Sequence, residues 1–274
     1  MNFLKDIFSK RNRVLLKEMV KTDFKLRYQG SILGHLWSVL KPLAMFFVMY
    51  MVFIRFLKFG ANLPKSDHFA MQLLLGTVVW QFFAETVMTG MQAILARGDL
   101  LRKINFPKII VVISASVGAL INFGINLLVV LFFAMINGVQ FDWRILLVVF
   151  VFLELYIFSL GLALFLGALY VKFRDIAHIW DIVMQAWMYA VPIIWPLSMI
   201  TTHYLFFAKI ILLDPIAQII QDARYLIITT HVETVWNFIG HWYYGLISVL
   251  IVILVFVIGL RTFNKNSQKF AEEI

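Results

Sequence analysis

The chain has 274 residues, of which 62% are hydrophobic and only 14% are charged, and its mean hydropathy is +0.88. A soluble domain of this length cannot cover so much apolar surface, because its exterior needs far more polar side chains. The composition therefore predicts an all-α integral membrane protein. The sequence contains no cysteine, which excludes a disulfide scaffold and a thiolate metal site.

The first segment in chain order, residues 3–28, carries apolar residues at roughly helical spacing with cations between them. A basic amphipathic helix ahead of a first span is typical of a helix that lies on the cytoplasmic membrane surface. The alternative is a positive flank that only orients the next helix. The first 35 residues lack an apolar stretch of signal-peptide length, so insertion is expected to use the first span.

Six later runs approach the roughly 20 apolar residues that a bilayer core requires. We predict transmembrane helices at 36–57, 69–93, 109–136, 145–170, 177–199 and 242–260. The stretch 205–230 is also apolar, but Asp214-Pro215, Asp222 and Arg224 interrupt it, so we predict a re-entrant or interfacial helix pair shielded by protein. No soluble domain or linker is evident, and residues 1–274 are expected to form one transmembrane domain.

The basic residues are distributed unevenly over the segments that these spans would separate. With the N-terminus inside, the inner segments hold eight cations before Gly30, four in 96–108, two in 171–176 and three after Leu260, whereas the outer segments hold six. This bias predicts a multi-pass membrane protein with both termini in the cytoplasm. It also accounts for the net charge of +9 without a nucleic-acid partner.

No motif for chemistry is recognisable in the chain. It lacks a phosphate-binding loop of the GxxxxGK[ST] type, and its six histidines are dispersed. The carboxylates inside predicted spans are Glu85, Glu154 and Asp181, which lie on three different spans. Such residues suit a proton relay or, alternatively, hydrogen bonds between helices, and their separation favours the second interpretation. An enzyme is therefore not indicated, and no metal site is predicted.

The segment 96–108 (ARGDLLRKINFPK) is short, predicted to be cytoplasmic and mixed in charge. Leu100, Leu101 and Ile104 would form one apolar face of a short helix, which suits a groove on a cytoplasmic partner. The alternative is a plain loop. Aromatic residues make up 16% of the chain, and six tryptophans, Trp80 among them, lie near predicted span ends, where most are expected to be interfacial anchors.

Several sequence blocks together resemble the membrane subunits of ABC exporters of the polysaccharide and polyol-phosphate class. These exporters carry O-antigen, capsule, teichoic acid and rhamnose-rich wall polysaccharide. The blocks are KLRYQGSILGHLWSVLKP at 25–42, RKINFPK at 102–108, VKFRDI at 171–176, WMYAVPIIWP at 187–196 and LLDPIAQIIQDARYLI at 212–227. The first block is the most specific, and Asp214-Pro215 departs mildly from the Asn-Pro of many members.

The resemblance implies roles for particular residues. The N-terminal amphipathic helix would be a gate that admits a lipid-linked glycan, and 96–108 would be the coupling helix that docks on the ATPase. Aromatic side chains would line the glycan path. The implied entrance residues are Arg27, Tyr28, Gly30, Ser31 and Trp37; the coupling residues are Arg97, Asp99, Leu100, Leu101, Lys103, Ile104 and Phe106; the path residues are Phe46, Tyr50, Phe82, Phe83 and Tyr189.

The resemblance also implies partners and a function. The chain is expected to form a homodimer with two copies of a separate ATPase, which would hold the ATP and Mg²⁺, so that this chain needs no cofactor. The complex would lie in the bacterial plasma membrane and export an undecaprenyl-linked polysaccharide, with a Gram-positive wall polysaccharide such as a rhamnan or teichoic acid favoured. The alternatives are an ABC exporter of a small hydrophobic compound and a membrane enzyme acting on lipid-linked sugars.

Overall fold

The computed structural model describes residues 9–26, 30–31, 33–59, 64, 68–201, 204–239 and 243–273. All regular structure within these residues is helical, which confirms the predicted fold class. Among them, five helical segments are long and apolar enough to cross a membrane: Trp37–Phe56, Phe69–Ala96, Ile109–Ile136, Trp143–Tyr170 and Tyr243–Ser267. They correspond to five of the six predicted spans.

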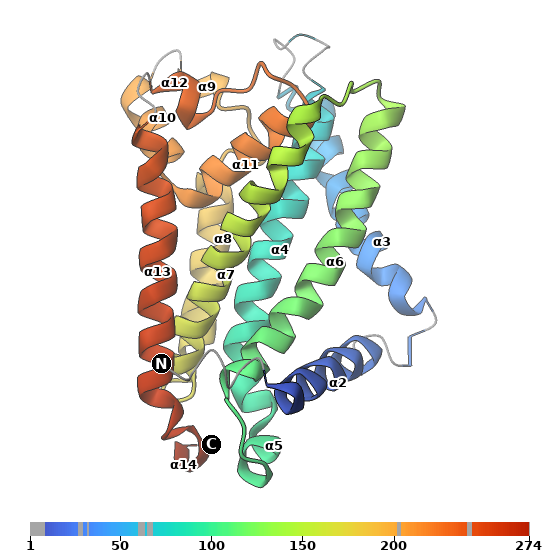
Figure 1. The fold of residues 1–274 in the computed structure, drawn as a ribbon. Helices are drawn as coiled ribbons and strands as arrows, with labels where there is room; N and C mark the ends of the chain where they lie inside the picture. The colour runs from blue at the N-terminus through green and yellow to red at the C-terminus, as the bar shows by residue number, and fades with distance from the viewer. Residues whose placement is uncertain are drawn as a thin grey trace.

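The helices form a bundle with two unlike ends (Figure 1). Its long members are α4 (Phe69–Ala96), α6 (Ile109–Ile136), α7 (Val148–Tyr170) and α13 (Tyr243–Ser267). One end, at the top of Figure 1, carries α9 (Ser198–Thr201), α10 (Leu205–Leu212) and α12 (Val235–Phe238). The other end carries α2 (Lys10–Leu26), α5 (Gly98–Lys103) and α14 (Phe270–Glu273), and we call it the basic end.

The amphipathic helix is present as α2, which lies across the basic end against α6. Met19 is only 3% exposed and packs with Leu101, Ile110 and Phe263 in an apolar cluster. The lysines and arginines of α2 stay on its outer sides, as expected for a helix at an interface. The predicted segment is therefore helical over Lys10–Leu26, while its residues 3–8, 27 and 28 lie outside the described part of the chain.

The tightest packing in the bundle joins α7 to α13. A Cβ atom built on Gly161 would lie 2.6 Å from the Cα of Phe256, and one built on Gly259 would clash with the carbonyl oxygen of Gly161. Because only glycine lacks a Cβ, the two backbones approach more closely here than any other residue would allow. We call this contact the glycine seam.

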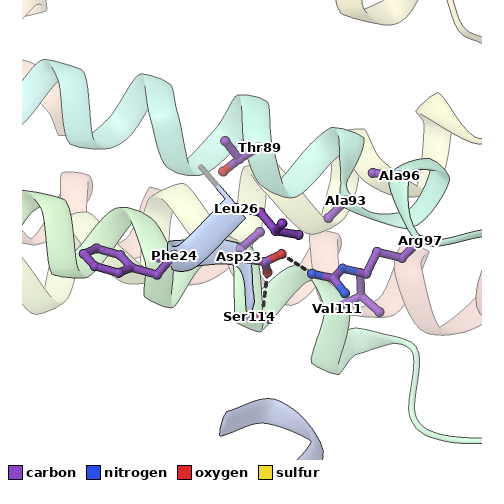
Figure 2. A pocket seen from close by; sticks show the side chains of 11 residues that line it. Asp23, Phe24, Leu26, Thr89, Ala93, Ala96, Arg97, Val111 and Ser114 are labelled. Atoms are coloured by element: carbon purple, nitrogen blue, oxygen red, sulfur yellow. Dashed lines mark hydrogen bonds and ion pairs between the residues drawn. The ribbon is translucent and has the colours of Figure 1, made fainter. Parts of the chain in front are cut away.

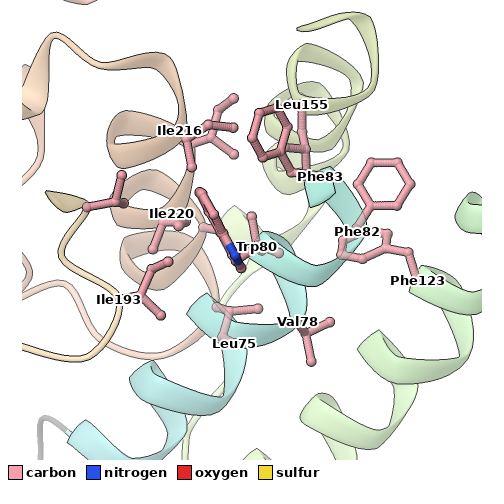
Figure 3. Close-up of a cluster of buried hydrophobic side chains, with 14 of the residues drawn as sticks. Leu75, Val78, Trp80, Phe82, Phe83, Phe123, Leu155, Ile193, Ile216 and Ile220 are labelled. Atoms are coloured by element: carbon pink, nitrogen blue, oxygen red, sulfur yellow. The ribbon is translucent and has the colours of Figure 1, made fainter. Parts of the chain in front are cut away.

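A cluster of buried aromatic and aliphatic side chains fills the space between α4, α7 and α11 (Pro215–Ile227) (Figure 3). Phe83 stacks on Phe158 at a centroid separation of 5.7 Å, and Trp187 meets both rings edge-on. Trp80 is also buried in this cluster. Trp80 is therefore an exception among the tryptophans near predicted span ends, because its ring packs against Phe83 and Trp187 instead of lying at an interface.

The first span consists of α3 (Trp37–Met49) followed by a π-helical stretch, η2 (Tyr50–Phe56). Pro42 lies inside α3 and has no N–H to donate to the carbonyl of Ser38, four residues earlier. The side-chain amide of Asn126 in α6 donates to that carbonyl at 3.1 Å. An amide from a neighbouring helix thus supplies the donor that the proline lacks.

The predicted span 177–199 is not a single helix. The helix α8 (Ile176–Ala190) has 15 residues and ends where Val191 becomes extended. Pro192 explains this end, since a proline disfavours helical geometry at the residue before it. The continuous helix predicted through residue 199 is therefore wrong, because residues 191–197 follow an irregular path.

The buried side chain of Arg224 holds the irregular segment in place. Its guanidinium donates to the carbonyl oxygens of Pro192 at 2.6 Å, Ile193 at 2.8 Å and Gln72 at 3.0 Å. It also donates to the side chain of Gln221 at 2.9 Å. Arg224 is 1% exposed, so its four acceptors replace the water that would otherwise solvate the cation. In turn, the guanidinium supplies the donors that the carbonyl groups of Pro192 and Ile193 need.

The stretch 205–230 contains two helices, α10 and α11, as predicted. The predicted shielding by protein holds for α11, which is mostly buried, whereas Phe206 and Phe207 of α10 are exposed. The break between them follows from Asp214-Pro215, since the Asp214 carboxylate accepts from the N–H groups of Ile216 at 2.8 Å and Ala217 at 3.1 Å. A proline in the first turn costs no hydrogen bond at this position. The indole of Trp187 donates to the same carboxylate at 2.7 Å, which ties α11 to α8.

Candidate functional site

A cavity of about 1030 Å³ separates α3 from α4 and α6. Its walls are mostly apolar, with Met45 and Val48 from α3, Phe82 from α4 and Phe123 from α6. None of the residues that line this cavity belongs to α7 or α13, the two helices that the glycine seam joins. We call this space the side cavity.

Polar side chains from three helices line the side cavity. Glu85 of α4 accepts from the side-chain amide of Asn122 in α6 at 3.0 Å. Asn126, one turn further along α6, donates to the carbonyl of Ser38, and Lys41 and Gln81 also face the cavity. Polar groups on membrane-spanning helices are costly next to lipid, so this wall suits a hydrated path or a polar ligand.

The interpretation of Glu85 as a partner in a hydrogen bond between helices is confirmed by its contact with Asn122. Asp181, in contrast, accepts from Gln185 of its own helix at 3.2 Å on an exposed face of α8. Sequence reasoning did not select Asn122 and Asn126 as site residues. Their signal was available, because two asparagines four residues apart share one face of a helix that is otherwise strongly apolar.

The five aromatic residues predicted to line a path lie in different environments. Phe82 lines the side cavity, whereas its neighbour Phe83 is fully buried in the aromatic cluster. Phe46 and Tyr50 are half-buried on the first span, with ring centroids 5.9 Å apart. Tyr189 is 66% exposed on α8. The structure therefore places only Phe82 of this set at the cavity.

Of the predicted entrance residues, the structure describes Gly30, Ser31 and Trp37. The indole of Trp37 donates to the hydroxyl of Ser31 at 3.1 Å, and Trp37 also lines the cavity. Gly30 has a φ of +81°, a conformation that favours glycine at this bend between α2 and α3. Arg27 and Tyr28 lie outside the described residues.

The predicted coupling residues divide into an inner and an outer set. Leu101 is 6% exposed and Phe106 is also buried, so both belong to the apolar cluster of the basic end, and Leu100 packs against it. The outer surface of the segment consists of exposed side chains: Asp99, Arg102, Lys103 and Ile104. The predicted apolar docking face is corrected accordingly, because Leu101 is covered by the chain's own helices.

Arg97 forms the joint between α4 and α5. Its N–H donates to the carbonyl of Ile94 at 3.3 Å, and its own carbonyl accepts from the N–H groups of Leu100 and Leu101, both at 3.1 Å. Its side chain forms an ion pair with Asp23 of α2. Arg97 thus contacts the amphipathic helix and the short helix at once.

Comparison with known proteins agrees with this architecture. Residues 14–228 match the family described as ABC-2 type transporter, and the chain belongs to that family. The O-antigen export system permease protein RfbA of Myxococcus xanthus is 35% identical over 188 residues, which cover 69% of this chain and 70% of that protein. A protein of the same name from Klebsiella pneumoniae is 27% identical over 264 residues, covering 94% of each chain.

These matches confirm the resemblance to ABC exporter permeases of the polysaccharide class. The family match covers the amphipathic helix from Val14, the side cavity, the coupling segment and the whole of the helix pair α10 and α11. The chain is thus a multi-pass membrane permease of the ABC-2 type, with long apolar helices that suit this class.

Proposed function

We propose that this chain is the membrane subunit of an ATP-driven exporter that moves a lipid-linked cell-surface polysaccharide from the cytoplasm to the exterior. Two relatives that match it over most of their length are named as O-antigen export permeases. The side cavity is the observation that carries the proposal, since it combines polar groups at Glu85, Asn122 and Lys41 with aromatic walls. Aromatic faces and hydrogen-bonding side chains together suit sugar rings.

The proposed topology has six crossings. The fifth is α8 continued by residues 191–197, because α8 alone is about 22 Å long at 1.5 Å per residue and a bilayer core is about 30 Å thick. The helix α11 would re-enter from the far side, shielded by α4, α7 and α13, and α10 would lead into it beside α9 and α12. The basic end would face the cytoplasm, in accord with its lysines and arginines, and would hold both termini.

The proposed assembly has two copies of this chain and two copies of a separate ATPase, which binds ATP and Mg²⁺. The exposed outer set of the coupling segment, from Asp99 to Ile104, would dock on the ATPase. Asp181 and Gln185 face outward from α8, where lipid would be a costly neighbour. A second copy placed against α8 and α3 would cover these groups and close the side cavity into a path.

The proposed substrate is a polysaccharide on a polyprenyl carrier such as undecaprenyl. O-antigen and wall polysaccharides, including rhamnans and teichoic acids, share this chemistry. The glycan that accumulates inside cells lacking the chain would identify which of them is carried. The aromatic and amide side chains of the side cavity would contact the sugars in each case.

The test is to fill the side cavity without disturbing the fold. Val48 lines the cavity and is exposed, so Val48→Trp should block it. Val149→Trp on the exposed outer face of α7 is the matched control. We expect the first variant to retain glycan inside the cell and the control to export normally. Normal export by Val48→Trp would contradict the proposed path.

A second test addresses the partner. Affinity purification of the tagged chain from its native membrane should recover an ATPase with a phosphate-binding loop in equal number. Recovery of the chain alone after crosslinking would contradict the exporter assembly. If cells lacking the chain exported all glycans but accumulated hydrophobic dyes, the substrate assignment would be wrong.

A further inference from the structure

The ion pair between Asp23 and Arg97 connects two helices that have separate roles in the proposed exporter (Figure 2). Asp23 belongs to the last turn of α2, and Arg97 is the joint between α4 and α5. The second oxygen of the Asp23 carboxylate accepts from the hydroxyl of Ser114 in α6 at 3.1 Å. One carboxylate therefore contacts α4, α5 and α6 through two side chains. We call this group of three residues the tether.

The position of Asp23 is not explained by the helix that carries it. A carboxylate near the C-terminal end of a helix is electrostatically unfavourable, because the last carbonyl groups already carry partial negative charge. The contacts with Arg97 and Ser114 supply the compensation, and both come from other elements. Asp23 is thus placed for a connection between helices rather than for the stability of α2.

The end of α2 also has room to move. A cavity of about 360 Å³ lies between Phe24 and Leu26 of α2 and the small side chains of α4 and α6, such as Ala93 and Ala115. Further back along α2, Met19 is buried in the cluster of the basic end. The helix is therefore packed in its middle, while the tether is the polar contact that holds its end beside this space (Figure 2).

From this geometry we infer that the tether transmits movement of α5 to the end of α2, and so couples ATPase docking to opening of the entrance. The inference rests on the proposed function. Movement of α5 relative to α4 reorients Arg97, because this residue is both the C-cap of α4 and the N-cap of α5. The guanidinium then carries Asp23 with it, and the cavity beside α2 accommodates the displacement. Asp23 is a positioning residue in this scheme and touches no substrate.

The test is a charge exchange in the intact complex with its ATPase. Asp23→Arg and Arg97→Asp each place like charges together, and the double variant Asp23→Arg with Arg97→Asp restores opposite charges. Glu18→Arg is the matched control, since Glu18 lies on an exposed side of the same helix and has the same change of charge. The readout is glycan exported per ATP hydrolysed, with thermal unfolding measured alongside.

We expect Asp23→Arg to lower the export per ATP about fivefold or more, the low end of typical coupling between sites, while ATP hydrolysis continues. The double variant should recover most of the ratio, and Glu18→Arg should leave it unchanged. The coupling role of the tether would be overturned by a parallel loss of hydrolysis and export in Asp23→Arg. Failure of the double variant to recover the export per ATP would overturn it as well. If the wild-type complex hydrolysed ATP but exported no glycan, the proposed function itself would fail.

Discussion

The two flanks of the bundle are packed in opposite ways. On one side the glycine seam joins α7 to α13 with backbone against backbone at Gly161 and Gly259. On the other side, α3 borders the side cavity and packs against α4 and α6 through side chains such as Met49, while Asn126 donates to the carbonyl of Ser38. Close backbone packing resists displacement, whereas side-chain contacts beside a cavity tolerate it.

The contrast indicates which part of the molecule is the frame and which part moves. We expect the α4–α7–α13 region to stay together through transport and the first span with α2 to shift. Substitutions in the frame should lower stability, while substitutions around the side cavity should change export at nearly constant stability. The following predictions address this division in order of expected effect.

The largest effect is expected for Gly259→Val at the glycine seam. The new side chain meets the backbone of Gly161, which cannot move aside, so the free energy of unfolding should fall by about 3 kcal/mol or more. Thermal unfolding of the purified permease measures this loss. Gly124→Val is the control, since a Cβ at Gly124 meets no atom within 4 Å. Equal stability of the two variants would contradict the assignment of the α4–α7–α13 region as the part that stays together.

Leu101→Asp should be nearly as damaging, because it places a carboxylate in the apolar cluster of the basic end. A loss of about 3 kcal/mol is expected from the removed packing and the buried charge. Ile104→Asp changes an exposed residue three positions later and should leave unfolding unchanged while weakening ATPase binding. If Leu101→Asp proved stable, the inner and outer sets of the coupling segment would have been assigned wrongly.

Arg224→Met removes four hydrogen bonds, two of which support the irregular segment after α8 at Pro192 and Ile193. Buried carbonyl groups would lose their donors, at a cost of about 2–3 kcal/mol in the free energy of unfolding. Arg144→Met removes an exposed ion pair with Asp142 and should cost far less. Comparison of the two melting temperatures provides the measurement, and similar values would argue against a structural role for Arg224.

A smaller effect is expected at the proline of the first span. Asn126→Leu leaves the carbonyl of Ser38 without the side-chain donor and should cost about 1 kcal/mol. Pro42→Ala returns a backbone donor to the same carbonyl, so Asn126→Leu should cost less in that background. A double-mutant cycle on thermal stability measures the difference. Additive effects would show that Asn126 does not compensate for Pro42.

The smallest effect is expected for Trp37→Phe, which removes an exposed hydrogen bond to Ser31. Stability should change by less than about 0.5 kcal/mol, as for most surface substitutions. Amide hydrogen exchange at Gly30 and Ser31 should nevertheless accelerate, since the bend loses its connection to α3. Unchanged exchange would indicate that this contact does not hold the entrance.

The sequence predicted those elements whose signal is local. The span 109–136 begins after Pro107 and runs through strongly apolar sequence without a charged residue, and the observed helix has the same bounds. The helix pair at 205–230 followed from the charged and polar residues around Asp214-Pro215. In contrast, hydropathy extended the predicted fifth span through residue 199, although Pro192 and Pro196 already marked a break in that apolar run.

The candidate site was less predictable because it depends on which side of a helix meets which neighbour. Phe82 and Phe83 are adjacent in sequence and equally apolar, yet one faces the side cavity and the other the aromatic cluster. Leu101 has the pattern of a docking residue, and only its packing in the apolar cluster of the basic end, with Met19 and Ile110, covers its side chain. Neither outcome is encoded in local spacing.

The π-helical stretch from Tyr50 to Phe56 has a consequence for changes in chain length. Its hydrogen bonds run from residue i to i+5, as between the Val52 carbonyl and the Leu57 N–H, so each turn holds one residue more than an α-turn. If one residue is deleted from this stretch, the π-helical turn can become an α-helical turn, and the flanking residues keep their positions. A one-residue deletion in α4 would instead rotate everything beyond it by about 100° and separate Glu85 from Asn122. Insertions and deletions among relatives should therefore gather at the end of the first span.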